Sequence, residues 1–178
     1  MTEQQEASED AVMTRIGQAV ILLHAGDREE ARNRLGAIWS EIGEEGDDLH
    51  RCTLAHYMAD AQDDPADELA WDLRALTAAE ALGDRPVTGA RNGGTAPREP
   101  HLAMRVFYPS LHLSLAADYV KLQRPEAARV HLARARAATG DLPDDGYGNG
   151  VREAIARLER RLATEPGAGP RPFPEQSP

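Results

Sequence analysis

Residues 112–138, HLSLAADYVKLQRPEAARVHLARARAA, carry the strongest structural signal in this sequence. Apolar residues recur at helical spacing on both sides of residues 123–125 (QRP), which predicts two helices joined by a tight turn. The apolar stripes consist of Leu115, Ala116 and Tyr119 before the turn and of Ala128, Leu132 and Ala135 after it. Neither helix buries its stripe alone, so the hairpin requires neighbours of the same kind.

Two weaker copies of this hairpin lie upstream. Small residues fall at matched positions, since Ala19 and Ala55 are 36 residues apart and Ala116 follows 61 residues after Ala55. We expect the Gly-, Pro- and Arg-rich segment 83–100 to be a flexible loop, which accounts for the longer interval. Apolar periodicity and capping residues predict helices at about 9–25, 28–43, 48–62, 65–82, 101–122, 125–138 and 150–163.

The composition favours a single all-α domain. Of the 178 residues, 41% are hydrophobic but only 4% are aromatic, and the residues that favour strands are sparse. We expect one helical domain at residues 8–163, with disordered tails at 1–7 and 164–178.

The charge and the terminal sequence restrict the partners and the location. A net charge of -10 disfavours direct nucleic-acid binding and favours a basic or neutral partner. Cys52 is the only cysteine, so no intramolecular disulfide can form. The acidic N-terminus lacks the features of a secretory signal, and no apolar run is long enough to span a bilayer. We therefore expect a cytoplasmic protein that does not bind membranes.

The hairpins resemble tetratricopeptide repeats (TPR), whose period is about 34 residues. The first copy carries Ala19, Leu22, Gly26, Asp27, Ala31, Leu35 and Ile38, the second carries Leu54, Ala55, Leu69, Leu73 and Leu76, and the third is residues 112–138. The copies depart from the family pattern at its inter-helix glycine, which is Gln62 in the second copy and Gln123 in the third. Residues 108–148 are also similar to TPR proteins of actinobacteria, which are commonly of unassigned function.

The resemblance implies a right-handed superhelical stack of about three TPR-like repeats, with residues 151–162 as a C-terminal capping helix. It also implies a concave groove lined by the first helix of each repeat. Mapped onto this sequence, the groove residues are Ile16, Val20, Leu23, His24, Cys52, Thr53, His56, Asp60, Leu113, Ser114, Ala117 and Lys121.

A groove of this kind implies a non-enzymatic scaffold that binds a peptide or a partner protein, without a cofactor. The alternative is a regulatory or sensor domain that binds a small molecule or a signalling peptide and controls a partner protein. Helix 150–163, loop 83–100 or a second copy of the chain could instead fill the groove, and a homo-oligomer is left open.

No constellation of residues rises to a catalytic or metal site. Cys52 and His56 share a helix face, with His50 nearby, but no fourth ligand and no CxxC spacing supports a zinc site. Cys52, His56 and Asp60 could act as a nucleophilic triad, but they lie on one helix that offers no oxyanion donors. We therefore expect no catalytic residue and no metal ligand.

Two further segments invite a functional hypothesis. The glycine-rich residues 146–150 lack the preceding strand and the following lysine of a phosphate-binding loop, so we expect a tight entry to a helix with Tyr147 as a packing residue.

The arginines at 129–161 form a basic end. A solvated face explains them most simply, and a docking surface for an acidic partner, including the acidic half of another copy, is the alternative.

Overall fold

The computed structural model describes residues 3–84 and 99–164, and these contain no β-strand. They form seven α-helices: α1 (Glu3–His24), α2 (Arg28–Ile42), α3 (Asp48–Asp60), α4 (Pro65–Asp84), α5 (Glu99–Lys121), α6 (Pro125–Ala137) and α7 (Gly146–Thr164). A short 3-10 helix, η1 (Thr139–Asp141), joins α6 to α7. The predicted all-α fold class is confirmed. Residues 85–98 of the expected loop, and 1–2 and 165–178 of the expected tails, lie outside the described residues.

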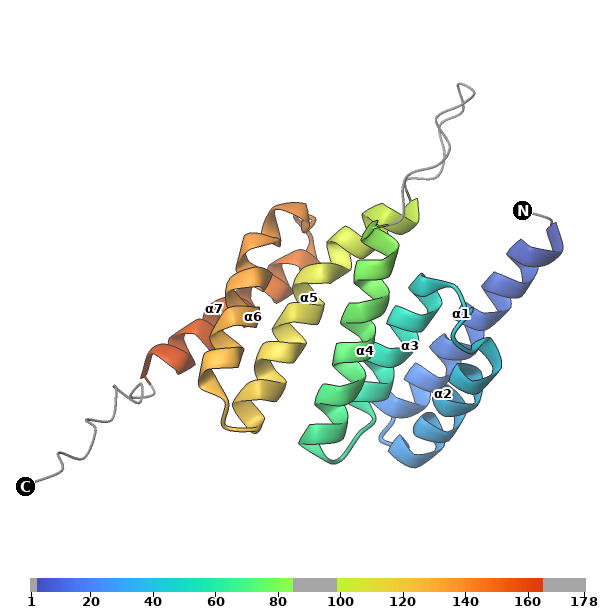
Figure 1. The fold of residues 1–178 in the computed structure, drawn as a ribbon, viewed down its shortest axis with the longest axis horizontal. Helices are drawn as coiled ribbons and strands as arrows, with labels where there is room; N and C mark the ends of the chain where they lie inside the picture. The colour runs from blue at the N-terminus through green and yellow to red at the C-terminus, as the bar shows by residue number, and fades with distance from the viewer. Residues whose placement is uncertain (1–2, 85–98, 165–178) are drawn as a thin grey trace, which may run out of the picture.

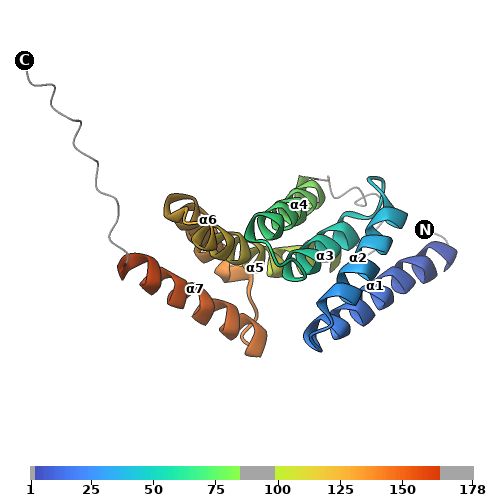
Figure 2. The same ribbon diagram turned by 90° about the horizontal axis from the view of Figure 1, so that it is seen from below.

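The helices pack as sequential antiparallel pairs (Figure 1). α1 packs against α2, α3 against α4 and α5 against α6, while α7 packs against α6 and α5. Each pair also joins the next, because α2 contacts α3 and α4 contacts α5. In the rotated view of Figure 2, α4 and α6 lie on one side of α3 and α5, and α1 and α7 lie on the other.

Aspartates at the helix starts explain why the chain turns where it does. Asp27 and Asp47 precede α2 and α3, and each carboxylate accepts hydrogen bonds from backbone N–H groups of the first turn. Asp64 does the same before α4, where Pro65 occupies a position that needs no N–H donor. The predicted boundaries of these three helices therefore agree with the structure to within two residues.

Two helices begin earlier than the sequence predicted. α1 begins at Glu3 rather than near residue 9, because the expected tail is built from strong helix formers. α7 begins at Gly146 rather than at 150, because the Asp145 carboxylate accepts the Gly148 N–H and caps the glycine-rich turn. A β-carbon at Gly148 would lie 1.9 Å from the carbonyl oxygen of Pro143, so this close approach of two segments requires glycine.

The first and third helix pairs share one turn structure. In each turn a backbone N–H donates to the carbonyl five residues earlier, from Asp27 in the first pair and from Arg124 in the third. The preceding residue adopts a left-handed conformation, with a φ of 91° at Gly26 and of 57° at Gln123. Because a β-carbon makes that conformation unfavourable, Gln123 carries strain that the glycine avoids.

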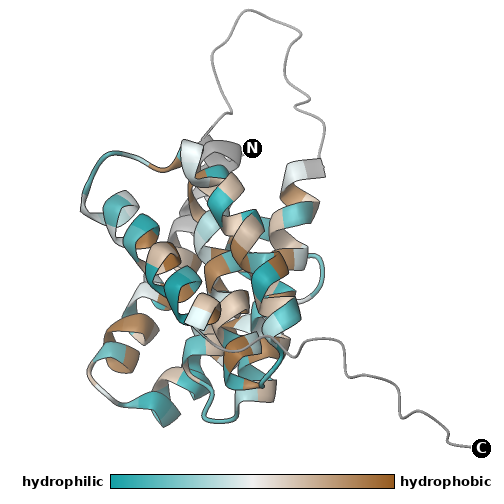
Figure 3. Cartoon of the chain, turned by 90° about the vertical axis from the view of Figure 1, so that its left-hand side faces the viewer, coloured by the Kyte–Doolittle hydropathy of each residue, from teal (hydrophilic) through white to brown (hydrophobic). Residues whose placement is uncertain are grey.

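The buried apolar residues are divided among the junctions between successive pairs. Ala19, Ala55 and Ala116, the small residues at matched positions, are completely buried. Separate clusters connect the first pair to α3, the second pair to α5 and the third pair to α7. Figure 3 shows hydrophobic and hydrophilic segments alternating along the helices. None of the helices in the described ranges carries an apolar stretch that could span a bilayer.

The buried face of α4 differs in part from the predicted one. The second copy of the hairpin pattern implies an inward position for Leu73 and Leu76; Leu76 is buried, but Leu73 is 39% exposed, so its inward position is wrong. Asp72 takes the inward position instead and is 2% exposed. The helix turns its small residues Ala75, Ala78 and Ala79 toward α3 and α5, and this rotation moves Leu73 to the edge.

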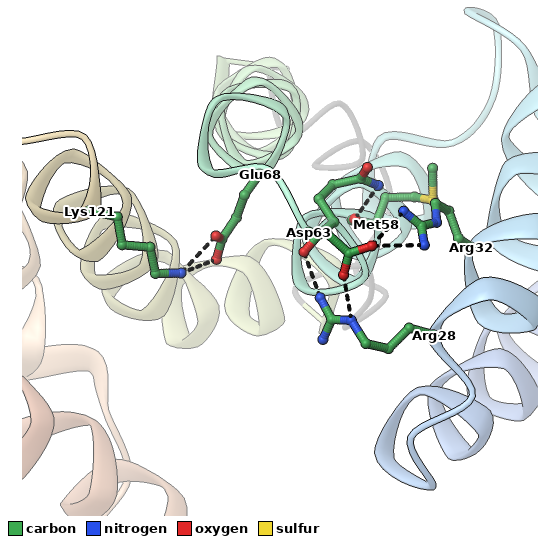
Figure 4. A network of polar contacts seen from close by, with 7 residues as sticks. Arg28, Arg32, Met58, Asp63, Glu68 and Lys121 are labelled. Atoms are coloured by element: carbon green, nitrogen blue, oxygen red, sulfur yellow. Dashed lines mark hydrogen bonds and ion pairs between the residues drawn. The ribbon is translucent and has the colours of Figure 1, made fainter.

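Ion pairs link the helix pairs along one edge (Figure 4). Asp63, between α3 and α4, accepts hydrogen bonds from Arg28 at 3.1 Å and from Arg32 at 3.3 Å, both in α2. Lys121, the last residue of α5, donates to both carboxylate oxygens of Glu68 in α4, at 2.6 and 2.7 Å. The first contact joins the first and second pairs, and the other joins the second and third.

Candidate functional site

An open depression of about 560 Å³ lies where α3, α5 and the start of α7 meet. Its walls are mostly apolar. We call it the apolar depression, and its lining residues are Leu49, Thr53 and Tyr57 from α3, Ala103, Val106 and Phe107 from α5, and Tyr147 from α7. One surface is therefore formed by α3 and α5, the first helices of the second and third pairs, together with the terminal helix α7.

Helical spacing places these side chains on one face of each helix. Leu49, Thr53 and Tyr57 follow one another at intervals of four residues, and Val106 and Phe107 of α5 lie three and four residues after Ala103. The early start of α7 brings Tyr147 to the depression, where its hydroxyl lies 2.6 Å from Ser110 Oγ. Tyr147 is 45% exposed and so forms part of the wall rather than a buried packing residue.

Four carboxyl groups form a cluster beside this depression. The carboxyl cluster consists of Asp60 in α3, Glu68 and Asp72 in α4, and Asp118 in α5. Asp72 and Asp118 are 2% and 1% exposed. Burial, followed by the charge and hydrogen bonding of Asp72, raises the pKa of Asp118 far above its ordinary value, so this pair holds a proton at neutral pH. The Oδ2 atom of Asp118 has no hydrogen-bond partner in the described part of the chain.

His56 connects the carboxyl cluster to the apolar depression. Its Nδ1 atom lies 3.3 Å from Asp72 Oδ1, and its ring packs edge-on against Phe107 with the ring centroids 5.1 Å apart. Burial lowers the pKa of His56, but the hydrogen bond and charge of Asp72 and the charge of Asp60 raise it more. His56 is therefore more protonated near neutral pH than a free histidine, which offsets part of the negative charge.

Asp60 is the member of the carboxyl cluster that faces solvent. Its pKa is raised, chiefly by desolvation and further by the charges of Asp72 and Glu68, while His56 and Lys121 oppose the shift. Asp60 forms no hydrogen bond or ion pair with another described residue. Lys121, the nearby lysine, instead binds Glu68 and lies 3.9 Å from Asp118, so the exposed carboxylate of Asp60 remains open to a ligand.

The structure brings together only part of the predicted groove. Thr53 lines the apolar depression, whereas His56, Asp60 and Lys121 lie in or against the carboxyl cluster. Val20, Leu113, Ser114 and Ala117 are half-buried, with Val20 and Leu113 packed against core clusters, and His24 is exposed at the end of α1.

Three predicted groove residues are corrected to core positions. Ile16 is 2% exposed, Leu23 is 8% exposed and Cys52 is completely buried. The physical reason is that the apolar face of a first helix is used against its own partner helix and the next pair. Large apolar side chains are therefore withdrawn from the surface, and polar and aromatic residues line it.

The environment of Cys52 argues against the nucleophile and zinc hypotheses. Its Sγ atom lies 3.8 Å from Met104 Sδ inside the core. Burial, and then the charge of Asp72, raises the pKa of the Cys52 thiol to about 12, so the reactive thiolate is scarce at neutral pH. Within residues 3–84 and 99–164 no three His, Cys, Asp or Glu side chains are grouped to hold a metal ion.

A histidine pair lies between α5 and α6. The Nδ1 atoms of His112 and His131 are 2.9 Å apart and their rings stack on each other; Tyr108 meets His112 edge-on, and Tyr119 stacks on His131. Burial, followed by the charges of His131 and Arg134, lowers the pKa of His112 to about 4, and burial and Arg134 also lower the pKa of His131. Both rings are therefore neutral at pH 7, and one donates its N–H to the other.

Sequence reasoning missed the two buried aspartates and the aromatic walls. Asp72 and Asp118 stand where the helical period calls for apolar residues, and a carboxylate within an apolar stripe was the signal that could have identified them. Phe107 and Tyr147 gave no comparable signal, because they are 40 residues apart and only the fold brings them together.

This geometry defines an all-α protein of sequential helix pairs, with an apolar depression beside a carboxyl cluster. Comparisons of the chain with protein families, with curated proteins and with solved structures found no match.

Proposed function

We propose that this chain is a non-enzymatic, tetratricopeptide-like scaffold that binds an extended or helical segment of a partner protein across the apolar depression. The observation that carries the proposal is the position of that depression. It lies on the first helices of two successive pairs, which are the elements that the family resemblance assigns to the groove, and it is bordered by Tyr147 at the start of the terminal helix.

Two further observations support a repeat architecture. The matched alanines Ala19, Ala55 and Ala116 are completely buried, as nesting of successive hairpins requires. The turns at Gly26 and Gln123 use the same hydrogen-bond pattern and the same left-handed conformation, although their sequences differ. Both agree with hairpins of one kind stacked into a right-handed superhelix, with α7 as the cap.

The open form of the depression favours a peptide over a small molecule as the ligand. Small-molecule sites usually enclose most of the ligand surface, whereas this depression is a broad trough with aromatic residues on both sides. The residues that would converge on a small ligand are already engaged. His56 binds Asp72 and Lys121 binds Glu68.

The test uses a random library of fluorescent twelve-residue peptides screened against the purified full-length chain. Val106→Gln places a polar amide in the wall of the depression, and Val130→Gln makes the same change at a site on α6 that is 50% exposed. Selected peptides should bind Val106→Gln about tenfold more weakly, because the wall loses roughly the contribution of one buried valine. They should bind Val130→Gln as they bind the wild type.

Circular dichroism and thermal unfolding would establish that both variants keep the fold. Failure of the wild-type chain to select any peptide would overturn the proposal. Equal affinity of the selected peptides for wild type and Val106→Gln would overturn it as well, because binding would then occur elsewhere.

A further inference from the structure

An acidic side chain, Asp60, follows the lining residues of the apolar depression along α3. Leu49, Thr53 and Tyr57 line the depression along α3, and Asp60 follows Tyr57 by three residues on the same helix. Three residues advance a helix by about 4.5 Å, so the Asp60 carboxylate lies about one turn beyond the aromatic wall. A guest that fills the depression therefore presents its next side chain to the carboxyl cluster.

The carboxyl cluster carries more acid than the neighbouring cations neutralise. Four carboxyl groups, which hold one proton in the Asp72–Asp118 pair, face one lysine, Lys121, and one histidine, His56. The lysine is held by both oxygens of Glu68, and the histidine is held by Asp72. Asp60 is left without an ion pair among the described residues, and it is the one aspartate of the cluster that solvent reaches.

A buried group of the same cluster also lacks a partner. Asp118 is 1% exposed, and its Oδ2 atom accepts no hydrogen bond from any described residue. An unsatisfied buried polar atom is costly. The Asp72–Asp118 pair holds one proton and so keeps one negative charge, and this charge and the open Asp60 carboxylate both favour a positively charged hydrogen-bond donor in the guest.

We infer that the guest of the apolar depression is a partner-protein segment in which a lysine or arginine follows an apolar anchor residue, with the anchor in the depression and the cation against Asp60. The inference rests on the proposed function and adds the chemistry of the partner. It agrees with the net charge of -10, which favours a basic partner by long-range attraction.

Lys121 then competes with the guest cation. Both positive groups interact with the same carboxyl cluster, because Lys121 binds Glu68, lies 3.9 Å from Asp118 and lowers the pKa of Asp60 through its charge. Removing the carboxylate of Asp60 should therefore weaken binding of the guest cation, and removing Lys121, which competes with that cation, should strengthen it. A purely apolar groove would not show this behaviour.

The experiment measures peptide affinity by fluorescence anisotropy with three probes that share one apolar anchor selected from the library. The residue after the anchor is lysine, its neutral analogue norleucine, or glutamate. The wild-type chain should bind the lysine probe about three- to tenfold more tightly than the norleucine probe and bind the glutamate probe most weakly. The preference should shrink as salt is raised.

Three variants locate the effect. Asp60→Asn should abolish the preference for lysine over norleucine, and Lys121→Gln should tighten binding of the lysine probe. Glu29→Gln removes one negative charge from an exposed site on α2 and should leave the preference unchanged, which separates a local contact from the overall charge.

Each outcome distinguishes the inference from the proposed function. If no probe binds, the proposed function fails. If all three bind equally and Val106→Gln still weakens them, the groove stands and its basic guest is overturned. Self-association of the wild type that Val106→Gln abolishes would identify a second copy as the occupant and would overturn the inference as well.

Discussion

Substitution of Asp118 by asparagine should change how the stability of the protein depends on pH. Asp118 is 1% exposed beside Asp72, which is 2% exposed. Burial, and then the charge and hydrogen bonding of Asp72, raises the pKa of Asp118 to about 9. Asparagine has nearly the shape of a protonated aspartate and cannot lose a proton. The Asp118→Asn variant should therefore fold normally, and the side chain at position 118 should no longer release a proton as pH rises.

The direction in which stability changes with pH follows from the number of protons bound to the folded and to the unfolded chain. Unfolded, Asp118 titrates near pH 3.9, so between about pH 4 and pH 9 the folded chain holds a proton that the unfolded chain has released. Wild-type stability must fall as pH rises through this window, by at most about 1.4 kcal/mol per pH unit. From pH 7.0 to 8.5 the loss attributable to Asp118 is therefore at most about 2 kcal/mol, and Asp118→Asn should not show it.

The assay is urea unfolding of wild type and variant at pH 7.0, 7.5, 8.0 and 8.5, followed by circular dichroism and by the fluorescence of Trp39 and Trp71. The difference between the two proteins reports the proton that the Asp72–Asp118 pair holds, because groups outside the pair contribute to both. Asp144→Asn is the matched control, since Asp144 is a highly exposed aspartate, and its curve should run parallel to the wild type. Parallel curves for wild type and Asp118→Asn would refute the reasoning.

Three further results are expected. Gln123→Gly should raise the free energy of unfolding in urea by about 1 kcal/mol, because it removes a side chain from a φ of 57°; a destabilised variant would contradict this. Gly148→Ala should lower Tm sharply, since its β-carbon would lie 1.9 Å from the carbonyl of Pro143, whereas Gly150→Ala, which meets nothing within 4 Å, should raise it slightly. The His112 ring should titrate by NMR with a midpoint of about 4, and a midpoint at or above 6.5 would show that burial beside His131 does not disfavour its charge. Because this pKa is lowered, the pair should cost stability as pH falls from about 6.5 toward 4.

The helix pairs could be predicted from the sequence because their signals are local. Each of the helices α2, α3 and α4 is capped by an aspartate, Asp27, Asp47 or Asp64, that accepts a hydrogen bond from a residue two or three positions away. Their starting points can therefore be predicted from the local sequence. The alanines at 19, 55 and 116 are buried as their matched spacing required. The start of α7 was not predictable in this way, because the helix begins among glycines that Pro143 and Asp145 support through contacts formed only in the folded turn.

The candidate site was predicted only in part. Thr53 lines the apolar depression and His56, Asp60 and Lys121 lie in or against the carboxyl cluster, but Ile16, Leu23 and Cys52 belong to the core. Helical periodicity identifies the face of a helix that is apolar and does not say which neighbour covers it. The residues that define the chemistry, Asp72 and Asp118, come from different pairs and acquire their altered proton affinity from one another.

The all-α class, the order of the helices and the small residues at which they pack can be read from the residues alone, because these features depend on backbone propensity and on spacing within one or two turns. The side chains that line the apolar depression and the carboxylates that are buried together became known from the packed helices. The reason is that burial and electrostatic coupling depend on distances between segments far apart in the chain, and those distances exist only after the pairs have packed.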